Sequence, residues 1–439
     1  MPELLIIADD FTGALDTGVQ FAKRGIQTFF SLKGDSALFA DPVTQVLVVD
    51  TESRHMEPKE AYRTVFEIVR RAKQSGVRHI YKKTDSTLRG NIGSELTAVL
   101  DAFNADTLAF VPAFPMTGRV TVNGFQYVDG EPLHKTVYAC DPLNPVKCSY
   151  IPDIIGEQTN INTVVVGKQE LYELVDKGLD KKRICVFDCE KDEEMIAIGH
   201  ALKKADQLNI SAGCAGFAAY LPELLGMDRN CDSSGSFVKR HNEGVLVICG
   251  SINELSLRQL KFGEKHDFCC ITLNPEEKLT ENYFDRPGGM GLIDKINKYL
   301  SSKKKLIIKA MEDKAEMEQV LLYSRNIGLT MKDIPLQVAR NMGELVKKVL
   351  EFNCIGTLVV FGGDTAVSVI KALGCDGIVP LEEIIPGVVA SRVIGADKAL
   401  LLITKAGGFG SENVLQEIEE YLNLHSLRDD SGTQAKKKP

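Results

Sequence analysis

The chain has 439 residues, of which 44% are hydrophobic and 26% are charged, and its formal net charge is −8. This length predicts two or three domains, and the acidic balance argues against a nucleic-acid partner, which would require a basic surface. No apolar run approaches the roughly 20 residues that span a bilayer, so no membrane partner is expected. The first run, Leu4–Ala8, ends at Asp9 and does not resemble a signal peptide. The cysteines and histidines follow no zinc-ligand spacing, and we expect reduced thiols in a cytoplasmic protein.

Residues 1–110 alternate between short apolar runs and helix-like segments. Leu4–Ala8 and Val46–Val49 are predicted to be buried strands, each followed by a helix, namely Ala14–Arg24 and the segment from Pro58 to Ser75. Successive parallel strands require right-handed crossovers, so helices should cover both faces of this sheet.

The pattern changes between Pro112 and Pro152, where prolines, glycines and the short run Phe125–Val128 indicate a hairpin. Strand-like runs return at Asn162–Val166 and Ile184–Asp188. Residues 228–243 are polar without apolar periodicity, which predicts a linker and a domain boundary near 240.

A second set of apolar runs follows the linker and predicts a second sheet. We therefore expect two α/β domains with mostly parallel sheets, over 1–235 and 240–425, and a disordered tail over 426–439. The strands of the second sheet are Val245–Cys249, Phe268–Leu273, Lys305–Ala310, Thr357–Phe361 and Leu400–Thr404.

Charged and hydroxyl side chains follow the strands of the first domain, at the sheet edge where α/β proteins bind ligands. Asp9 and Asp10 could bind polyol hydroxyls or serve as a general base, although one of them could equally cap the following helix. Arg54 is suited to gripping a carboxylate in bidentate fashion. The predicted substrate-binding residues are Asp9, Asp10, Arg54, Lys83, Thr84, Asp85, Ser86 and Arg89, with Asp10 or Asp85 as the catalytic base.

The strands of the second domain end in glycine-rich loops. Glycines let the backbone approach a phosphate, and a following helix favours the anion through its N-terminal amides. Asp364 or Thr365 could cap that helix or reach a magnesium ion through water, and a tight turn without a ligand is the alternative for this loop taken alone. Three such loops in one sheet favour a nucleotide. The predicted ATP-binding residues are Gly250, Ser251, Gly362, Gly363, Asp364, Thr365, Lys405, Gly407 and Gly408.

A cationic, hydroxyl-rich site on one sheet and a phosphate site on the other fit phosphoryl transfer to a small anionic polyol. The motifs that carry this pattern also resemble those of the four-carbon acid sugar kinase family, in family order over nearly the whole chain. They are Ala8–Ala14, Lys82–Gly93, Val111–Pro115, Asp141-Pro142, Gly362–Thr365 and Lys405–Gly410.

The resemblance implies ATP-dependent phosphorylation of the terminal (C4) hydroxyl of threonate, erythronate or an oxo-tetronate. It implies that the acid sugar binds the N-terminal domain, that ATP with Mg²⁺ binds the C-terminal domain, and that the ligand site lies in the cleft between them. The identity of the acid, the metal ligands and a homodimeric state stay open. The alternative is a sugar-acid-binding sensor of the same fold, which would bind tetronates without forming ADP.

Overall fold

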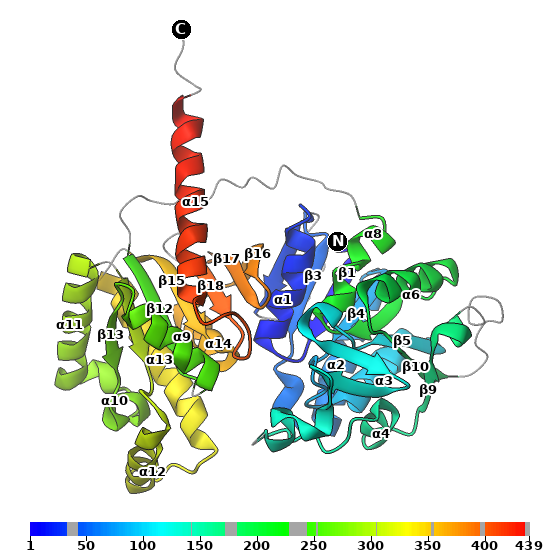
Figure 1. The fold of residues 1–439 in the computed structure, drawn as a ribbon, viewed down its shortest axis with the longest axis horizontal. Helices are drawn as coiled ribbons and strands as arrows, with labels where there is room; N and C mark the ends of the chain where they lie inside the picture. Colours follow the sequence, from blue (N-terminus) through cyan, green and yellow to red (C-terminus); the bar gives the residue numbers. More distant parts are fainter. Residues whose placement is uncertain are drawn as a thin grey trace. The chain divides into compact units, whose positions relative to one another are not determined.

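The structure is a computed structural model that divides into two compact units, Met1–Ser233 and Ser234–Pro439. The predicted fold class, α/β with mostly parallel sheets, is confirmed (Figure 1). The predicted linker over 228–243 lies outside the described residues. The structure describes residues 1–32, 43–141, 143–171, 182–227, 244–251, 253–303, 305–352, 355–395 and 400–434.

The first unit contains a wholly parallel sheet. Its strands are β1 (Leu4–Ala8), β2 (Thr28–Ser31), β3 (Val46–Asp50), β4 (His79–Lys83), β5 (Thr107–Val111), β9 (Asn162–Val166), β10 (Arg183–Phe187) and β11 (Ile210–Gly213). Within this unit they lie in the order β2-β3-β1-β4-β11-β5-β10-β9. The register pairs Ala8 with Asp50 on one side and with Lys83 on the other, so the segments that follow β1, β3 and β4 begin at one edge.

Helices cover both faces of this sheet, as the crossover rule requires. Leu5, Ile7 and Ile80 pack with apolar residues of α2 and α3 in one core cluster, whereas α1 contacts the sheet on the other face (Figure 1). Alternate strand residues point to opposite faces, so Lys82 follows Ile80 towards α3 and Lys83 points towards α1. The helices are α1 (Phe11–Ala22), α2 (Pro58–Gln74), α3 (Ile92–Phe103), α4 (Ile151–Gly156), α6 (Asp192–Lys204), α7 (Ala215–Ala218) and α8 (Leu221–Leu224).

The predicted hairpin is part of a small antiparallel sheet made of β6 (Arg119–Val122), β7 (Phe125–Val128) and β8 (Glu131–Pro132). Its turns are Asn123-Gly124 and Asp129-Gly130, in which all four residues have positive φ. Asn-Gly and Asp-Gly pairs are favoured in such two-residue turns because the conformation costs them little.

The sheet of the second unit combines a parallel part with a hairpin. Its strands are β12 (Gly244–Cys249), β13 (Cys269–Thr272), β14 (Lys305–Lys309), β15 (Ile355–Phe361), β16 (Gly377–Ile385), β17 (Val388–Ile394) and β18 (Leu401–Lys405). Within this unit they lie in the order β13-β14-β12-β15-β18-β17-β16, and β17 pairs antiparallel with both neighbours. The β16–β17 hairpin was not predicted from the sequence. Two register shifts interrupt it, so the strict alternation that marks a strand is lost.

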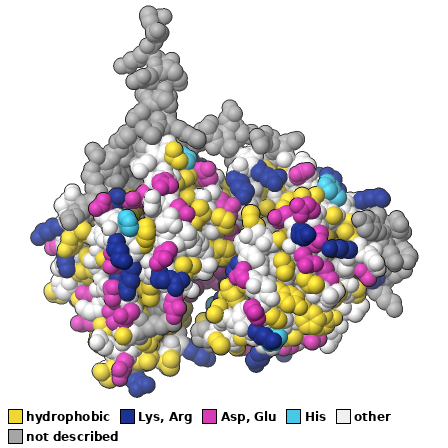
Figure 2. Space-filling view, viewed as in Figure 1, with side chains coloured by type: hydrophobic (Ala, Val, Ile, Leu, Met, Phe, Trp, Pro, Cys, Tyr) yellow, Lys and Arg dark blue, Asp and Glu magenta, His cyan; other side chains and the backbone are white. Residues whose placement is uncertain are grey.

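The helices of the second unit are α9 (Glu254–Glu264), α10 (Pro275–Leu279), α11 (Pro287–Lys303), α12 (Met317–Asn326), α13 (Asp333–Phe352), α14 (Gly363–Leu373) and α15 (Val414–Gln434). Helix α15 is anchored by buried Leu415, Ile418 and Leu422, and it continues into the segment predicted to be disordered, because extending a nucleated helix is easier than starting one. Residues 435–439 lie outside the described part. No described helix is both long and apolar enough to cross a lipid bilayer. On the face shown in Figure 2, basic and acidic side chains are interspersed.

Helices α13 and α14 pack closely at Gly343, so a substitution there tests how tightly the core of the second unit is packed. A Cβ there would lie 2.5 Å from the carbonyl oxygen of Ser368, which is backbone and cannot rotate away. Gly343→Ala should therefore lower stability by about 1–3 kcal/mol. Gly291→Ala in α11, where a Cβ meets nothing within 4 Å, is the matched control and should raise stability by about 0.5–1 kcal/mol. Thermal melting of both variants checks this, and a Gly343→Ala variant as stable as the parent would contradict it.

Candidate active site

Arg54 lies at the centre of the strand-end residues of the first unit. Its Nε donates to Asp9 Oδ2 at 2.7 Å, and its Nη2 lies 2.9 Å from Asp10 Oδ1 and 3.6 Å from Asp85 Oδ1. Burial alone would raise the pKa of Asp9, but the charges of Arg54, Lys82 and Lys83 bring it below its usual value. The structure thus brings together four residues predicted from three separate segments of the sequence. Among the described residues, no hydrogen bond or ion pair involves the other terminal nitrogen of Arg54, Nη1.

Asp10 belongs to this cluster and also caps α1. Its Oδ1 accepts from the backbone N–H of Gly13 at 3.0 Å, and its Oδ2 accepts from the hydroxyl of Thr12 at 2.9 Å. The capping role and the site role are therefore both compatible with its position. The Asp10 side chain is 24% exposed, against 1% for Asp9, so it is the more accessible of the two carboxylates.

Lys83 is a buried cation that lacks an ion-pair partner among the described residues. It is 4% exposed, and its ammonium donates to the carbonyl of Thr84 at 2.7 Å. It lies against α1, where a Cβ on Gly13 would come within 2.6 Å of Nζ, so only glycine leaves room for it. A buried charge is costly unless it is paired, so this ammonium is a candidate for binding an anion.

Asp85 is held by the loop that follows β4. Arg89 contacts both of its oxygens, through Nε at 2.7 Å and Nη2 at 3.1 Å, and the hydroxyl of Thr87 donates to Oδ2 at 2.5 Å. Burial opposes ionisation, but the charges of Arg89 and Arg54 hold the pKa of Asp85 well below its usual range. Arg89 is itself oriented by Asp141 at 3.1 Å. Asp85 is therefore an ionised anchor for two arginines.

The remaining predicted residues of this loop differ in accessibility. Thr84 is wholly buried and its hydroxyl has no partner among the described residues, whereas Ser86 is half-buried and its carbonyl accepts from the Gln126 amide at 3.3 Å. Ser86 can therefore present its side chain to a ligand more readily than Thr84 can.

Asp50, which ends β3 beside Ala8, lies at this site although it was not among the predicted residues. Burial raises its pKa to about 8, and the charges of Asp10 and Asp9 act in the same direction. A neutral carboxyl at this position could donate a hydrogen bond to a ligand. The signal was present, since Asp50 opens the polar cluster after an apolar strand, but only Arg54 was selected from that cluster.

Four predicted residues meet at the loops of the second unit. A Cβ on Gly250 would lie 2.5 Å from Thr365 Oγ1, and one on Gly362 would lie 3.6 Å from Cβ of Ser251. Gly362 is the N-cap of α14 with φ of 97°, and no described side chain caps this helix, so of the two roles considered for Asp364 and Thr365 the helix cap is not formed. Helix-terminal amides without an intrahelical acceptor remain there, which suits an anion.

The third loop is tied to the second by Lys405. Its carbonyl accepts from the N–H of Gly362 at 3.0 Å, and its buried ammonium donates to Ser256 Oγ at 3.0 Å and to the carbonyl of Gly407 at 3.1 Å. Burial lowers the pKa of Lys405 to about 8. At Gly407 a Cβ would meet nothing within 4 Å, so its backbone is open to a ligand. The predicted residue Gly408 is exposed, as is Asp364, and Gly363 is half-buried.

The described residues contain no group of three or more His, Cys, Asp or Glu side chains that could together hold a metal ion. Magnesium in nucleotide sites is held by one or two carboxylates together with water and phosphate oxygens, so it requires no such group. Asp364, in the first turn of α14, is the acidic side chain placed to fit this arrangement.

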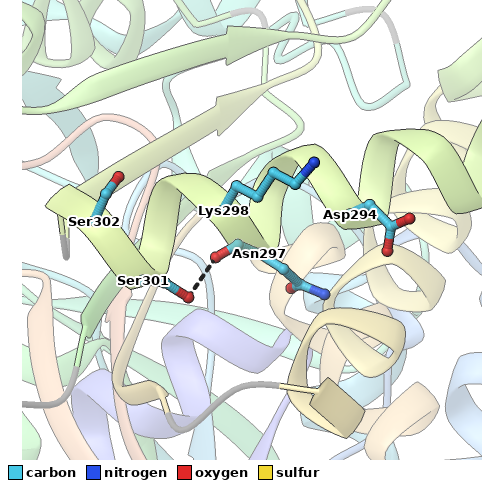
Figure 3. A pocket seen from close by; sticks show the side chains of 5 residues that line it. All are labelled: Asp294, Asn297, Lys298, Ser301 and Ser302. Carbon is cyan, nitrogen blue, oxygen red and sulfur yellow. Dashed lines mark hydrogen bonds between the residues drawn. The ribbon is translucent and has the colours of Figure 1, made fainter.

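An open surface hollow on α11 lies on the exposed side of that helix and not at a strand end (Figure 3). It is lined by Asp294, Asn297, Lys298, Ser301 and Ser302. All five residues belong to α11, so one helix supplies the whole lining. The hydrogen bond from the Ser301 hydroxyl to the carbonyl of Asn297, at 2.8 Å, also lies within this helix. None of the predicted site residues contributes to it.

Two family models cover most of the chain. Residues 4–221 match a sugar-binding N-terminal domain, and residues 246–415 match a nucleotide-binding C-terminal domain. The chain is 28% identical to a D-threonate kinase of Salmonella typhimurium, over 96% of this chain and 98% of that relative. It is 30% identical to a D-erythronate kinase of Heliobacterium modesticaldum, over 96% and 97%. A 3-oxo-tetronate kinase of Brucella melitensis is 25% identical over 95% of each chain.

A crystal structure from Salmonella typhimurium LT2, described there as a tRNA synthase, has a similar fold. Its TM-score is 0.77 at 22% identity, and the match covers 95% of this chain and 99% of that one. At this identity the likeness is informative about the fold alone.

Proposed function

The chain belongs to the four-carbon acid sugar kinase family, and within that family we propose that it transfers the terminal phosphoryl group of ATP to the C4 hydroxyl of a tetronate. It is a kinase of the acid sugar type. The proposal adds the phosphate donor, the acceptor hydroxyl and the residues that act on each.

The unpaired ammonium of Lys83 beside the carboxylate cluster is the observation that carries this proposal. Lys83 and the free Nη1 of Arg54 offer positive charge to the carboxylate of the acid sugar. Asp10 and Ser86 offer acceptors to its hydroxyls. A neutral polyol would leave the Lys83 charge unpaired, so a hydroxy-acid fits this site better.

Asp10 is better placed than Asp85 to accept the proton that the C4 hydroxyl loses as its oxygen bonds to phosphorus. Two contacts from Arg89 and one from Thr87 occupy the Asp85 oxygens, and its side chain is 10% exposed. Asp10 is more exposed, and no arginine of the described residues binds both of its oxygens. Phosphoryl transfer depends mainly on positioning and charge neutralisation, so the base must above all lie within reach of the C4 hydroxyl.

The loops at Gly250, Gly362 and Gly407 would hold the nucleotide phosphates through backbone amides and the N-terminus of α14. Asp364 would contact Mg²⁺ through water. When bound, ATP supplies the phosphoryl group and Mg²⁺ offsets its negative charge. Lys405 would support the loop by holding Ser256 and the Gly407 carbonyl.

The pKa of Lys405, about 8, should make nucleotide affinity depend on pH. A bound phosphate stabilises the protonated ammonium, so above pH 8 binding must take up a proton. The Kd of a non-hydrolysable ATP analogue should then rise by up to about tenfold per pH unit, and it should be flat below pH 7. Lys405→Met should show weaker binding without this slope. Calorimetric titration from pH 6.5 to 9.5 checks this, and a pH-independent Kd in the parent would contradict it.

The direct test is an assay of D- and L-threonate, D- and L-erythronate and the 3-oxo-tetronates with Mg-ATP, in which ADP and phosphorylated acid are both quantified. At least one acid should give the two products in equal amounts, with the phosphate on C4 by phosphorus NMR. A tetronate-induced rise in melting temperature without ADP from any acid would instead indicate a sensor. A phosphate on another carbon would overturn the C4 assignment.

A further inference from the structure

A wholly buried ion pair lies behind the proposed substrate site. Lys82 on β4 and Glu95 in the first turn of α3 are both 0% exposed, and Nζ lies 3.1 Å from Oε2. Burying two charges costs several kcal/mol each, and replacing such a pair by apolar residues is often neutral or stabilising. A contribution to stability is therefore a weak explanation for the presence of this ion pair. The other contacts of its two residues indicate its role.

Glu95 connects the pair to the turn that carries Arg54. Its Oε1 accepts from the hydroxyl of Ser53, and this hydroxyl lies 2.6 Å from that of Thr51. Thr51 in turn donates to the carbonyl of Ala8 at the end of β1, at 2.7 Å. These bonds fix residues 51–53 to β1 on one side and to α3 on the other.

The same turn is fastened from the loop before α3. The Asn91 amide donates to the carbonyls of Ser53 and Met56, at 2.8 and 2.9 Å. Gly90 has φ of 88°, and a Cβ on it would lie 3.0 Å from Cγ of Arg54, so this loop packs directly on the arginine. The backbone that sets the direction of the Arg54 side chain is thus held from several elements.

The charges of the pair act on the same group. Lys82 is among the cations that lower the pKa of Asp9, and Asp9 holds Nε of Arg54 at 2.7 Å. Lys82 therefore supports Arg54 through Asp9, and Glu95 supports it through Ser53.

We propose that Lys82 and Glu95 are positioning residues for the acid-sugar site: they hold Arg54 in the orientation that presents Nη1 to the substrate. Neither side chain reaches a ligand, since both are fully buried. The expected effect on KM rests on the proposed function, whereas the expected effect on the position of the Arg54 side chain does not.

The test compares two double variants. Lys82→Met with Glu95→Leu removes both charges and the acceptor for Ser53, whereas Lys82→Met with Glu95→Gln removes the charges but keeps an acceptor oxygen. The first should raise KM for the acid sugar roughly 10- to 100-fold, as expected for a misplaced binding group, and leave KM for ATP unchanged. The second should raise KM less, by roughly threefold to tenfold, because the amide oxygen still accepts from Ser53 while the support that Lys82 gives to Asp9 is lost.

Lys278→Met in the second unit is the matched control. Lys278 is also buried, and it donates to the Ala310 carbonyl at 2.5 Å and lies 3.7 Å from Glu316. This variant should alter the melting temperature without changing KM for the acid sugar.

A readout independent of activity is the ¹⁵N NMR signal of Arg54 Nε–H, assigned by its loss in Arg54→Lys. The signal should be protected from exchange with solvent in the parent and in the glutamine double variant, and exchange should be fast in the leucine variant. Equal protection in all three, or an unchanged KM in a folded leucine variant, would overturn the proposal. If the protection of Arg54 Nε–H differed between the variants as expected but the parent showed no kinase activity, only the proposed function would be refuted.

Discussion

Arg54→Ala is expected to lower kcat/KM for the acid sugar by roughly 10²- to 10⁴-fold, the equivalent of about 3–5 kcal/mol. The variant loses the cation that binds Asp9 and Asp10 and faces Asp85, so three carboxylates are left in a partly buried cluster. Loss of a buried partner costs about the same in folding stability. Steady-state kinetics and urea unfolding measure the two effects.

The stability loss should depend on pH in a defined direction. In the parent, Arg54 is foremost among the charges that keep the pKa of Asp9 below its unfolded value despite burial, so this contribution is present at neutral pH and is lost as pH falls. In Arg54→Ala, burial is left as the main influence and raises the pKa of Asp9, so the folded protein prefers the neutral acid. The deficit relative to the parent should therefore be largest at pH 7 and shrink towards pH 4.

Arg70→Ala provides a matched control. Arg70 pairs with Glu67 at 2.5 Å on the surface of α2, where both side chains are more than 40% exposed. A surface pair of this kind adds little to stability because water screens the charges, and its removal should leave acid-sugar kinetics unchanged. If Arg54→Ala were as mild as Arg70→Ala in both measurements, Arg54 would not be the centre of the site.

Asp10→Asn is expected to lower kcat by roughly 10²- to 10⁴-fold, the usual effect of removing a general base, with a small change in KM. The amide can still accept from the Gly13 N–H, so the cap of α1 is kept and the fold should survive. Asp85→Asn should act differently, mainly by raising KM for the acid sugar. The substitution removes the negative charge that pairs with Arg89 and faces Arg54, so both arginines lose an ion pair.

Rapid-quench measurement of the chemical step for both variants separates these roles. A larger loss in the chemical step for Asp85→Asn than for Asp10→Asn would assign the base to Asp85. Near-parental rates in both would remove a carboxylate base from the mechanism.

The strand ends of the first unit could be predicted because their signals are local. Each apolar strand stops at a polar cluster, and the parallel arrangement then brings Asp10, Arg54 and Asp85 to one edge. The contacts within the cluster could not be predicted in the same way. The pairing of Lys82 with Glu95 depends on which face of β4 meets α3, and adjacent lysines in the sequence do not reveal which one is paired and which is unpaired.

The second unit shows a different limit of sequence reasoning. The position of the glycines after apolar strands was sufficient to predict the loops at Gly250 and Gly362. Of the two roles considered for Asp364 and Thr365, the helix cap is not formed, since Gly362 itself takes the N-cap position of α14 with positive φ. The β16–β17 hairpin was missed because its irregular register leaves no regular alternation.

The central claim is that the first unit binds the acid sugar and the second binds the nucleotide. Its most direct test is calorimetric titration of each ligand, the acid sugar and a non-hydrolysable ATP analogue, into folded Lys83→Met and Gly362→Val. Gly362 has φ of 97°, a conformation that costs a residue with a side chain about 1–3 kcal/mol, so a valine there should make the loop rearrange. We predict that Lys83→Met no longer binds the acid sugar but still binds the nucleotide analogue. Gly362→Val should still bind the acid sugar but no longer bind the nucleotide analogue. Loss of the nucleotide in Lys83→Met with its retention in Gly362→Val would contradict the account.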